Sequence, residues 1–417
     1  MSSEYVSSGS IDIKKLEIVS YDGSKQYNLM SQVMTFSIFE DTMFPVIRAE
    51  FYMNDAIDLQ TSFPIIGEEI INVEFSTAGY DLVNSYKLYV KSVENQAVAP
   101  GTKGKTYLIR AVSEEFIYNS IILINKKVQD DSFKIVRNIM KEILKTDKNV
   151  NIEETKGVQE LLITQTKPFQ AIDMIRKRSV SKKYASSSYL FFENKRGFNF
   201  CTIEYLFDNL KGNVNDKIFF YDSATDTDAK NMNSRNIIGM RNISSVNNVK
   251  KLATGSLNNI VKRFDLLTGG VFDTNYVNSE QQSKFKAPNE NPIGLNTTHY
   301  EQKFGKYNAT TMLVPHSSHL PENFIAESIG AKHSFAAKIA QNIYHIHVYG
   351  DSALTAGDII TIKVPKVTGA VENKDDRLVA GNYMISKLRH IVVNSTSQRK
   401  TYTCSMEVIK GSYEDNA

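Results

Sequence analysis

The stretch GDSALTAGDII, from Gly350 to Ile360, indicates the fold most clearly. It follows an alternating apolar and polar segment, Tyr344 to Tyr349, and it leads into another, Ile359 to Val364. Alternation with a period of two predicts strands that have one buried and one exposed face. Small residues bounded by Gly-Asp at both ends are typical of a tight corner between strands. This part of the chain is therefore predicted to be antiparallel β structure.

Further strands are predicted on both sides of this corner. Tyr383 to Val393 and Tyr402 to Val408 alternate in the same way after it. Near the N-terminus, runs rich in Val, Ile, Phe and Tyr are separated by turn signals such as Asp22-Gly23 and Pro100-Gly101. Short strands at this spacing predict an antiparallel sandwich or barrel of roughly six or seven strands. The N-terminal runs are Ile11 to Val19, Val33 to Phe39, Val46 to Met53, Ile70 to Phe75, Tyr86 to Val93 and Thr106 to Val112.

The period changes between the two β regions. From Phe133 to about Lys145 the apolar residues recur at helical spacing. A second helix is predicted with Pro168 in its first turn, where a missing N–H costs nothing, and with the basic run Arg176 to Arg178 near its end. A β hairpin from Tyr189 to Ile203 follows. Residues 117–228 are therefore predicted to form a mixed α/β domain.

The chain is harder to assign between residues 236 and 334. Residues 270–334 hold four of the nine prolines and many asparagines. Structureless stretches of this length are uncommon inside compact domains, so we expect an inserted subdomain of loops and short elements. A short amphipathic helix from Phe335 to Ile343 is predicted where the chain returns to the second β region.

Composition excludes several classes of function. The net charge is +3, from 49 basic and 46 acidic residues with the two signs interspersed, whereas a dedicated nucleic-acid binder has a basic excess or stripe. Cys201 and Cys404 form no CxxC pair, so we expect buried thiols rather than a zinc or redox motif. The segment Met1 to Tyr5 lacks the features of a signal peptide, and no apolar run reaches the roughly 18 residues of a membrane span. We expect a protein made soluble in a cytoplasm.

The search for chemistry yields weak candidates. His345 and His347 share one face of a predicted strand, and His316 and His319 are spaced HxxH. A tetrahedral metal site needs a third and a fourth ligand, and no Cys or carboxylate lies at a sequence spacing that suggests one. Surface or hydrogen-bonded histidine is the preferred interpretation. No GxSxG, HExxH, GxxxxGK[ST] or GxGxxG motif is present. We therefore predict no catalytic residue, no metal and no cofactor.

Three stretches resemble one known family in their order along the chain. Three parts of the chain are similar to the central baseplate hub of contractile-tailed bacteriophages of the T-even type. The first is the corner from Gly350 to Ile360, with Pro365 behind the second strand, and the second consists of the segments that start at Tyr383 and Tyr402. The third is the stretch from Thr166 to Ile172, which contains Pro168, with the later hairpin from Tyr189 to Ile203. They are also similar to the hub-like part of type VI secretion spikes. The residues that match the family's structural pattern are Gly350, Asp351, Gly357, Asp358, Pro365, Pro168, Tyr383 and Tyr402.

The resemblance implies a β-rich α+β fold with two antiparallel β-barrels of the tail-tube type, an interposed α/β domain and an insertion in the second barrel. The implied boundaries are 1–116 for the first barrel, 117–228 for the α/β domain, 229–266 with 335–412 for the second barrel, 267–334 for the insertion subdomain and 413–417 for a tail.

The resemblance also implies a structural function in the tail baseplate of a virion, assembled in the host cytoplasm, and no enzymatic activity. Hubs of this family form homotrimers that join a sixfold tail tube to a threefold central spike, and baseplate wedge proteins surround them. DNA passes through their channel without specific binding, and they do not insert stably into a membrane. The alternatives are a receptor- or carbohydrate-binding tail protein, which abundant Tyr permits, and a cell-wall hydrolase of the tail tip, for which no site signature is visible.

Overall fold

The computed structural model of the protein describes most of the chain between residues 8 and 413. The described ranges are 8–57, 59–98, 104–184, 186–209, 217–221, 235–244, 258–265, 268–277, 291–292, 310–315, 329–330, 332–334, 336, 339, 342–365, 375–376, 378–394 and 400–413. Within this part, no helix is both long enough and apolar enough to span a membrane.

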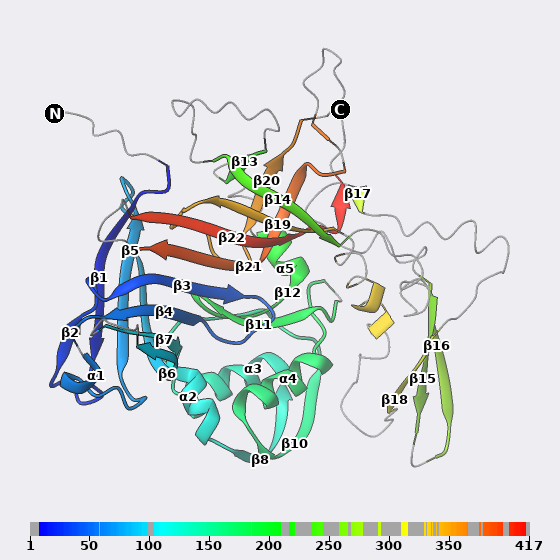
Figure 1. Cartoon of the computed structure of the whole chain (residues 1–417). Helices are drawn as coiled ribbons and strands as arrows, with labels where there is room; N and C mark the ends of the chain where they lie inside the picture. The colour runs from blue at the N-terminus through cyan, green and yellow to red at the C-terminus, as the bar shows by residue number, and fades with distance from the viewer. Residues whose placement is uncertain are drawn as a thin grey trace.

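A 13-stranded sheet dominates the molecule (Figure 1). Its strands are β1 (Ile11–Val19), β2 (Gln26–Asn28), β3 (Val33–Asp41), β4 (Arg48–Asp55), β5 (Ile70–Thr77), β6 (Asn84–Val98), β7 (Lys105–Val112), β13 (Ile218–Phe220), β14 (Ile237–Ser244), β19 (Ile343–Tyr349), β20 (Ile359–Lys363), β21 (Gly381–Val393) and β22 (Thr401–Ile409). They pair in the order β14-β19-β22-β21-β3-β4-β7-β6-β5-β1-β2, and β20 branches from β21 and carries β13. We call β1 to β7 the first β region and β14 with β19 to β22 the second β region.

The predicted strands of both β regions are present, and β6 is longer than predicted. Alternation of burial accounts for them: along β4, Ala49, Phe51 and Met53 are buried while the residues between them are half-buried or exposed. Branched and aromatic side chains pack well on such a pleated face.

The two β regions meet edge to edge. Strand β21 pairs antiparallel with β3, from Lys387 opposite Asp41 to Val393 opposite Thr35. One apolar core extends beneath both regions. Among the described strands the pairing does not close into a ring, so the fold established here is a β-rich α+β fold with one large, mostly antiparallel sheet.

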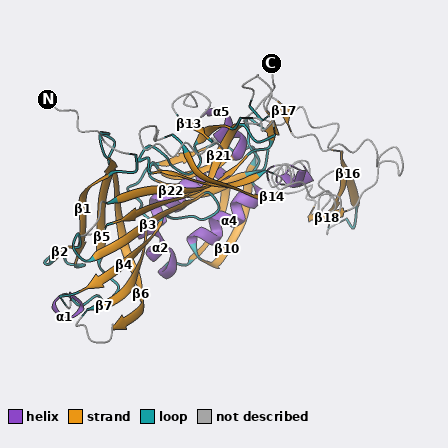
Figure 2. Cartoon of the chain, turned by 45° about the horizontal axis from the view of Figure 1, so that its top comes forward, coloured by secondary structure: helices purple, strands orange, loops and turns teal. Residues whose placement is uncertain are grey.

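A mixed region of helices and small sheets lies against this sheet (Figure 2). Pro168 opens its α4 helix and Ile172 and Ile175 are fully buried, so this predicted helix is confirmed. The other predicted helix is also present, but its second half is π-helical. The predicted hairpin ends one residue early, because Ile203 begins a helix instead. The elements are α2 (Glu114–Ile121), β8 (Ile124–Asp131), α3 (Ser132–Asn138), η1 (Ile139–Ile143), β9 (Val150–Ile152), β10 (Val158–Thr166), α4 (Pro168–Arg178), β11 (Tyr189–Asn194), β12 (Gly197–Thr202) and α5 (Ile203–Asn209).

Two apolar clusters hold the mixed region in place. One lies inside it, between α3, α4 and β11–β12. The other joins it to the second β region, where Leu190 and Phe192 of β11 share a cluster with Met384 and Ile409. Cys201 belongs to this second cluster, and both cysteines are buried and free, as predicted.

The remaining elements are short. They are α1 (Leu59–Ser62), β15 (Asn258–Phe264), β16 (Val271–Val277), β17 (Asn291–Pro292), β18 (Thr310–Pro315) and β23 (Ser412–Tyr413). Strands β16, β15 and β18 form a separate three-stranded sheet that stands apart from the large one in both views (Figures 1 and 2). Ile343, which we predicted at the end of a helix, is the first residue of β19, because its neighbours alternate between buried and exposed.

Candidate functional site: a polar joint between three parts of the chain

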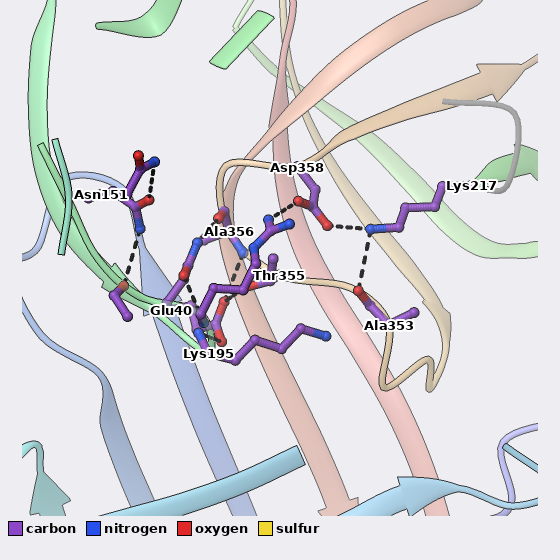
Figure 3. A network of polar contacts seen from close by, with 12 residues as sticks. Glu40, Asn151, Lys195, Lys217, Ala353, Thr355, Ala356 and Asp358 are labelled. Atoms are coloured by element: carbon purple, nitrogen blue, oxygen red, sulfur yellow. Dashed lines mark hydrogen bonds and ion pairs between the residues drawn. The ribbon is translucent and has the colours of Figure 1, made fainter. Parts of the chain in front are cut away.

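Glu40, near the end of β3, is the centre of a polar cluster where the two β regions and the mixed region meet (Figure 3). The residue is 1% exposed. Its carboxylate accepts hydrogen bonds from the Thr355 hydroxyl at 2.5 Å and the Ala356 N–H at 2.8 Å. It also accepts from the Lys195 N–H at 3.1 Å and the Tyr86 hydroxyl at 3.3 Å. One side chain thus connects β3 to three segments that are distant in sequence.

Burial raises the pKa of the Glu40 carboxyl, because the charged form loses its hydration. The hydrogen bonds from Thr355 and Ala356 and the nearby Lys195 oppose that rise. A buried carboxylate is costly unless hydrogen-bond donors surround it. The joint is therefore stable only while all its segments are docked.

The turn between β11 and β12 supplies the contribution of the mixed region. The Asn194 amide donates to the Ala356 carbonyl at 2.9 Å, and the Lys195 ammonium donates to the Ser352 carbonyl at 2.6 Å. Gly197 closes the turn with φ 117°, and a Cβ there would overlap a neighbouring backbone carbonyl. These contacts hold the turn against the corner between β19 and β20.

Both aspartates of that corner are ion-paired. Asp358, which is 3% exposed, pairs with Arg196 of the β11–β12 turn and with Lys217 beside β13. Asp351 pairs with Arg235 at 3.0 Å. Ion pairs therefore hold the corner at both of its ends.

The two glycines of the corner are required for different reasons. A Cβ at Gly350 would overlap the ring of Tyr402, whose carbonyl accepts the Gly350 N–H at 2.9 Å. Gly357 adopts φ 91°, a region that side chains disfavour, and its N–H donates to the Ile385 carbonyl at 2.9 Å. The corner therefore lies close against β21 and β22.

The core behind the joint is aromatic. His390 of β21 and Tyr402 of β22 are fully buried, with 2.7 Å between the His390 Nδ1 and the tyrosine hydroxyl oxygen. Burial lowers the pKa of His390 to about 3, so the imidazole is neutral at ordinary pH. Phe75 of β5 contacts both rings. First and second β regions therefore share this packing.

A second ionic cluster connects the mixed region to the first β region. The Lys148 ammonium lies 2.7 Å from a Glu115 carboxylate oxygen and 2.6 Å from one of Glu193. The other oxygen of Glu193 accepts the Ile47 N–H at 3.0 Å. Because Glu193 is adjacent to the β11–β12 turn, the two clusters support the same segment.

The chemistry of the joint is structural. Its charged groups are satisfied by one another, and the part of the chain that the structure describes holds no group of three or more side chains that could bind a metal ion. His345 lies on the sheet surface, 2.7 Å from the Ser405 hydroxyl, and His316 and His319 fall outside the described residues. The arrangement is suited to fixing the positions of three parts of one chain.

The structure brings together five of the eight residues singled out from the sequence, namely Gly350, Asp351, Gly357, Asp358 and Tyr402. The other three lie elsewhere. Tyr383 is fully buried in β21 beside Tyr344, Pro365 makes an isolated bridge after β20, and Pro168 begins α4.

Sequence analysis missed Glu40, Lys195 and Arg196. Glu40 carried a usable signal, since it continues the buried face of Phe36 and Ile38 on the alternating strand. A carboxylate at an inward strand position is rarely buried without partners. The turn residues carried no such signal, because Lys-Arg in a hairpin turn is ordinary solvated sequence.

A large antiparallel sheet with a mixed region docked on it makes up a fold that tail proteins also have. The chain is similar in structure to the tail protein from Neisseria meningitidis MC58, with a TM-score of 0.56 over 96% of each chain at 9% sequence identity. It is similar to the 43 kDa tail protein of prophage MuSo2 from Shewanella oneidensis, with a TM-score of 0.55 over 95% of this chain and 98% of that one at 10% identity.

At such identities the likeness establishes the fold. The resemblance is confirmed at that level, as a likeness of fold to tail proteins over nearly the whole chain. No protein-family model matches the sequence, and no curated protein matches it.

Proposed function

We propose that this chain is the central hub of a contractile-tail baseplate. Three copies form a ring in which each copy contributes two similar β units. The ring presents six units to the tail tube protein on one side and keeps threefold symmetry for the central spike protein on the other. Baseplate wedge proteins surround it, DNA passes through its channel, and the chain has no enzymatic activity.

The observation that carries this proposal is the edge-to-edge pairing of β3 with β21. It places the N-terminal and C-terminal β regions side by side in one continuous sheet. Two units joined in this way occupy adjacent positions along a ring wall. The likeness of the fold to phage tail proteins supports the same role.

The polar joint supports a role under mechanical load. Glu40 and Asp358 fix the angle between the two β regions and the mixed region through buried, charge-assisted contacts. A hub has to transmit force from a contracting tail without changing shape, and such contacts resist rotation.

The exposed face of the large sheet supports a DNA channel. Two of its cations are paired across strands: Lys387 with Glu407 at 2.9 Å, and Arg110 with Glu50 at 3.3 Å and Glu94 at 3.1 Å. Affinity for DNA comes mainly from cations that are available to phosphates. Pairing of these two cations reduces what this face offers to phosphates, as passage of DNA without specific binding requires.

Electron microscopy of the purified chain, alone and with tail tube and spike proteins, tests this function. We expect a three-lobed ring with a central channel and a mass of three copies. A particle that stays monomeric with every partner contradicts the proposal. If such a monomer instead bound whole host cells, it would be a receptor-binding tail protein, and if it degraded peptidoglycan, a hydrolase.

A further inference from the structure

Strand β6 has an open edge along its first part. Residues Asn84 to Tyr89 pair with β5 on one side, but on the other side β7 pairs with β6 only from Tyr89 onward. The reason is that β7 ends at Val112, where the chain turns into α2. Among the described strands, the segment 84–88 therefore has a neighbour on one side only.

The main-chain groups of Ser85 and Lys87 face this open edge. The Val90 N–H donates to the Glu69 carbonyl at 2.9 Å, on the side of β5. Successive residues of an antiparallel strand direct their N–H and C=O alternately to the two sides, so Ser85 and Lys87 direct theirs away from β5. Neither β7 nor any other described segment is hydrogen-bonded to these groups.

A cavity of about 410 Å³ lies beside the open edge. Ser85 and Lys87 line it together with residues 147–149 and the β11–β12 turn. Neighbouring strands lie about 4.8 Å apart, so an added strand would occupy the space directly next to β6. Binding sites usually begin at about 300 Å³, so this cavity is large enough to hold a bound segment.

The open edge favours a peptide as the occupant of this cavity. Ser85 and Lys87 are two residues apart, and each presents one N–H donor and one C=O acceptor in the same direction. An extended main chain repeats donor and acceptor with the same period of two residues. Addition of a strand to an open edge draws its affinity from such main-chain hydrogen bonds.

The charges that line the cavity favour an acidic peptide. Lys148 and Arg196 are already paired with carboxylates. Among the described residues, Lys87 and Lys195 make no ion pair, and Asp147 is the one lining carboxylate in the same condition. Burial lowers the pKa of the Lys195 ammonium even though Glu40 and Asp358 lie nearby, so its charge is incompletely compensated. The unpaired cations therefore exceed the unpaired carboxylates.

We propose that the open edge of β6 binds an extended, acidic peptide segment of a partner protein as an added strand. The segment hydrogen-bonds to the main chain of Ser85 and Lys87. The Lys87 side chain is on the exposed face of β6, while Tyr86 and Leu88 are buried on the other face. A carboxylate directly opposite Lys87 therefore pairs with its ammonium at the surface. The inference goes beyond the hub proposal, because a single copy of the chain forms the whole site.

A capped five-residue peptide of threonine, valine, glutamate, valine and threonine, labelled with a fluorophore, tests the site. Its branched residues favour an extended conformation. We expect the wild type to bind it, and Lys87→Ala to bind it about 5-fold more weakly, the effect of losing an exposed ion pair. Methylation of the glutamate nitrogen removes a donor to β6 and should weaken binding about 10- to 100-fold. Methylation of a valine nitrogen, which points away from β6, is the matched control. Fluorescence anisotropy measures each affinity.

Hydrogen exchange locates the bound peptide on the chain. The Ser85 and Lys87 amides should exchange more slowly in the complex, whereas the Tyr86 and Leu88 amides, already bonded to β5, should not change. Lys91→Ala removes an exposed cation from the same strand outside the cavity and should bind the peptide as the wild type does.

Three results would overturn the inference. They are a wild type that does not bind the peptide, equal binding of the two methylated peptides, and equal binding of a peptide with lysine in place of glutamate. None of them touches the hub proposal, which imaging with tube and spike proteins decides separately.

Discussion

Replacing Glu40 by alanine removes the acceptor that four donors share in the joint. Each buried donor left without a partner costs about 1–3 kcal/mol before relaxation. Because the segments can shift apart and admit water, we expect a total loss near the about 3–5 kcal/mol typical of breaking a buried charged contact. Glu40→Gln keeps the shape and one acceptor oxygen, so it should cost less, about 1–3 kcal/mol.

Urea unfolding of the purified chain measures the loss, and hydrogen exchange locates it. The Ala356 and Lys195 amides donate directly to Glu40, so their protection should fall first in the variant. The matched control is Glu50→Ala on the neighbouring strand β4, where the carboxylate makes a surface ion pair with Arg110 at 3.3 Å. Such pairs contribute about 0–1 kcal/mol.

Two results would refute this reasoning. One is a Glu40→Ala variant whose unfolding free energy matches that of Glu50→Ala. The other is a pair of amides, at Ala356 and Lys195, that exchange as slowly as in the wild type. Either result would mean that apolar packing alone holds the three parts together.

Three further predictions concern the same region. Gly350→Ala forces a methyl group into the ring of Tyr402 and should lower the free energy of unfolding by about 1–3 kcal/mol, which a lower melting temperature would show. Gly239→Ala, whose Cβ would have no atom within 4 Å, should leave the melting temperature unchanged. Equal shifts in the two variants would contradict the packing argument. Because the pKa of Glu40 is raised in the folded state, its contribution to stability is greatest below the unfolded pKa and is lost as pH rises through the folded pKa. Lowering the pH from about 7 toward 4.5 should therefore stabilise the wild type relative to Glu40→Gln in parallel urea titrations, and a constant difference would argue against it. Burial raises the pKa of Cys404 to about 12, so a thiol reagent at about pH 8 should label neither cysteine until the chain unfolds; labelling of the native protein would show that this core opens.

Local patterns in the sequence predicted the strands and the α4 helix well. These signals are local, since each depends only on neighbours in the chain. They are the alternation along β1, β3 and β22 and the proline at the start of α4. The corner at Gly350 was identified for the same reason. The glycines and aspartates that indicate its conformation all lie within one short segment.

The joint was not predictable in this way, because its partners are brought together only by the complete fold. Nothing near Glu40 in sequence indicates that Thr355 and Lys195 will donate to it. The pairing of β3 with β21, rather than closure of each β region on itself, is likewise a choice between edges that look alike in sequence. Periodicity identifies a strand and its buried face, but not the neighbour of that strand.

The seam between β3 and β21 has a consequence for synthesis of the protein. Ser37 and Arg389, which are hydrogen-bonded across it, are 352 positions apart. At roughly 5–20 residues per second, a ribosome needs about 20–70 s to deliver the second partner after the first. Throughout that interval the edge of β3 is open to pairing with other nascent chains. Emergence of β21, and not completion of the N-terminal half, therefore sets the moment at which the edge of β3 is protected from pairing with other chains.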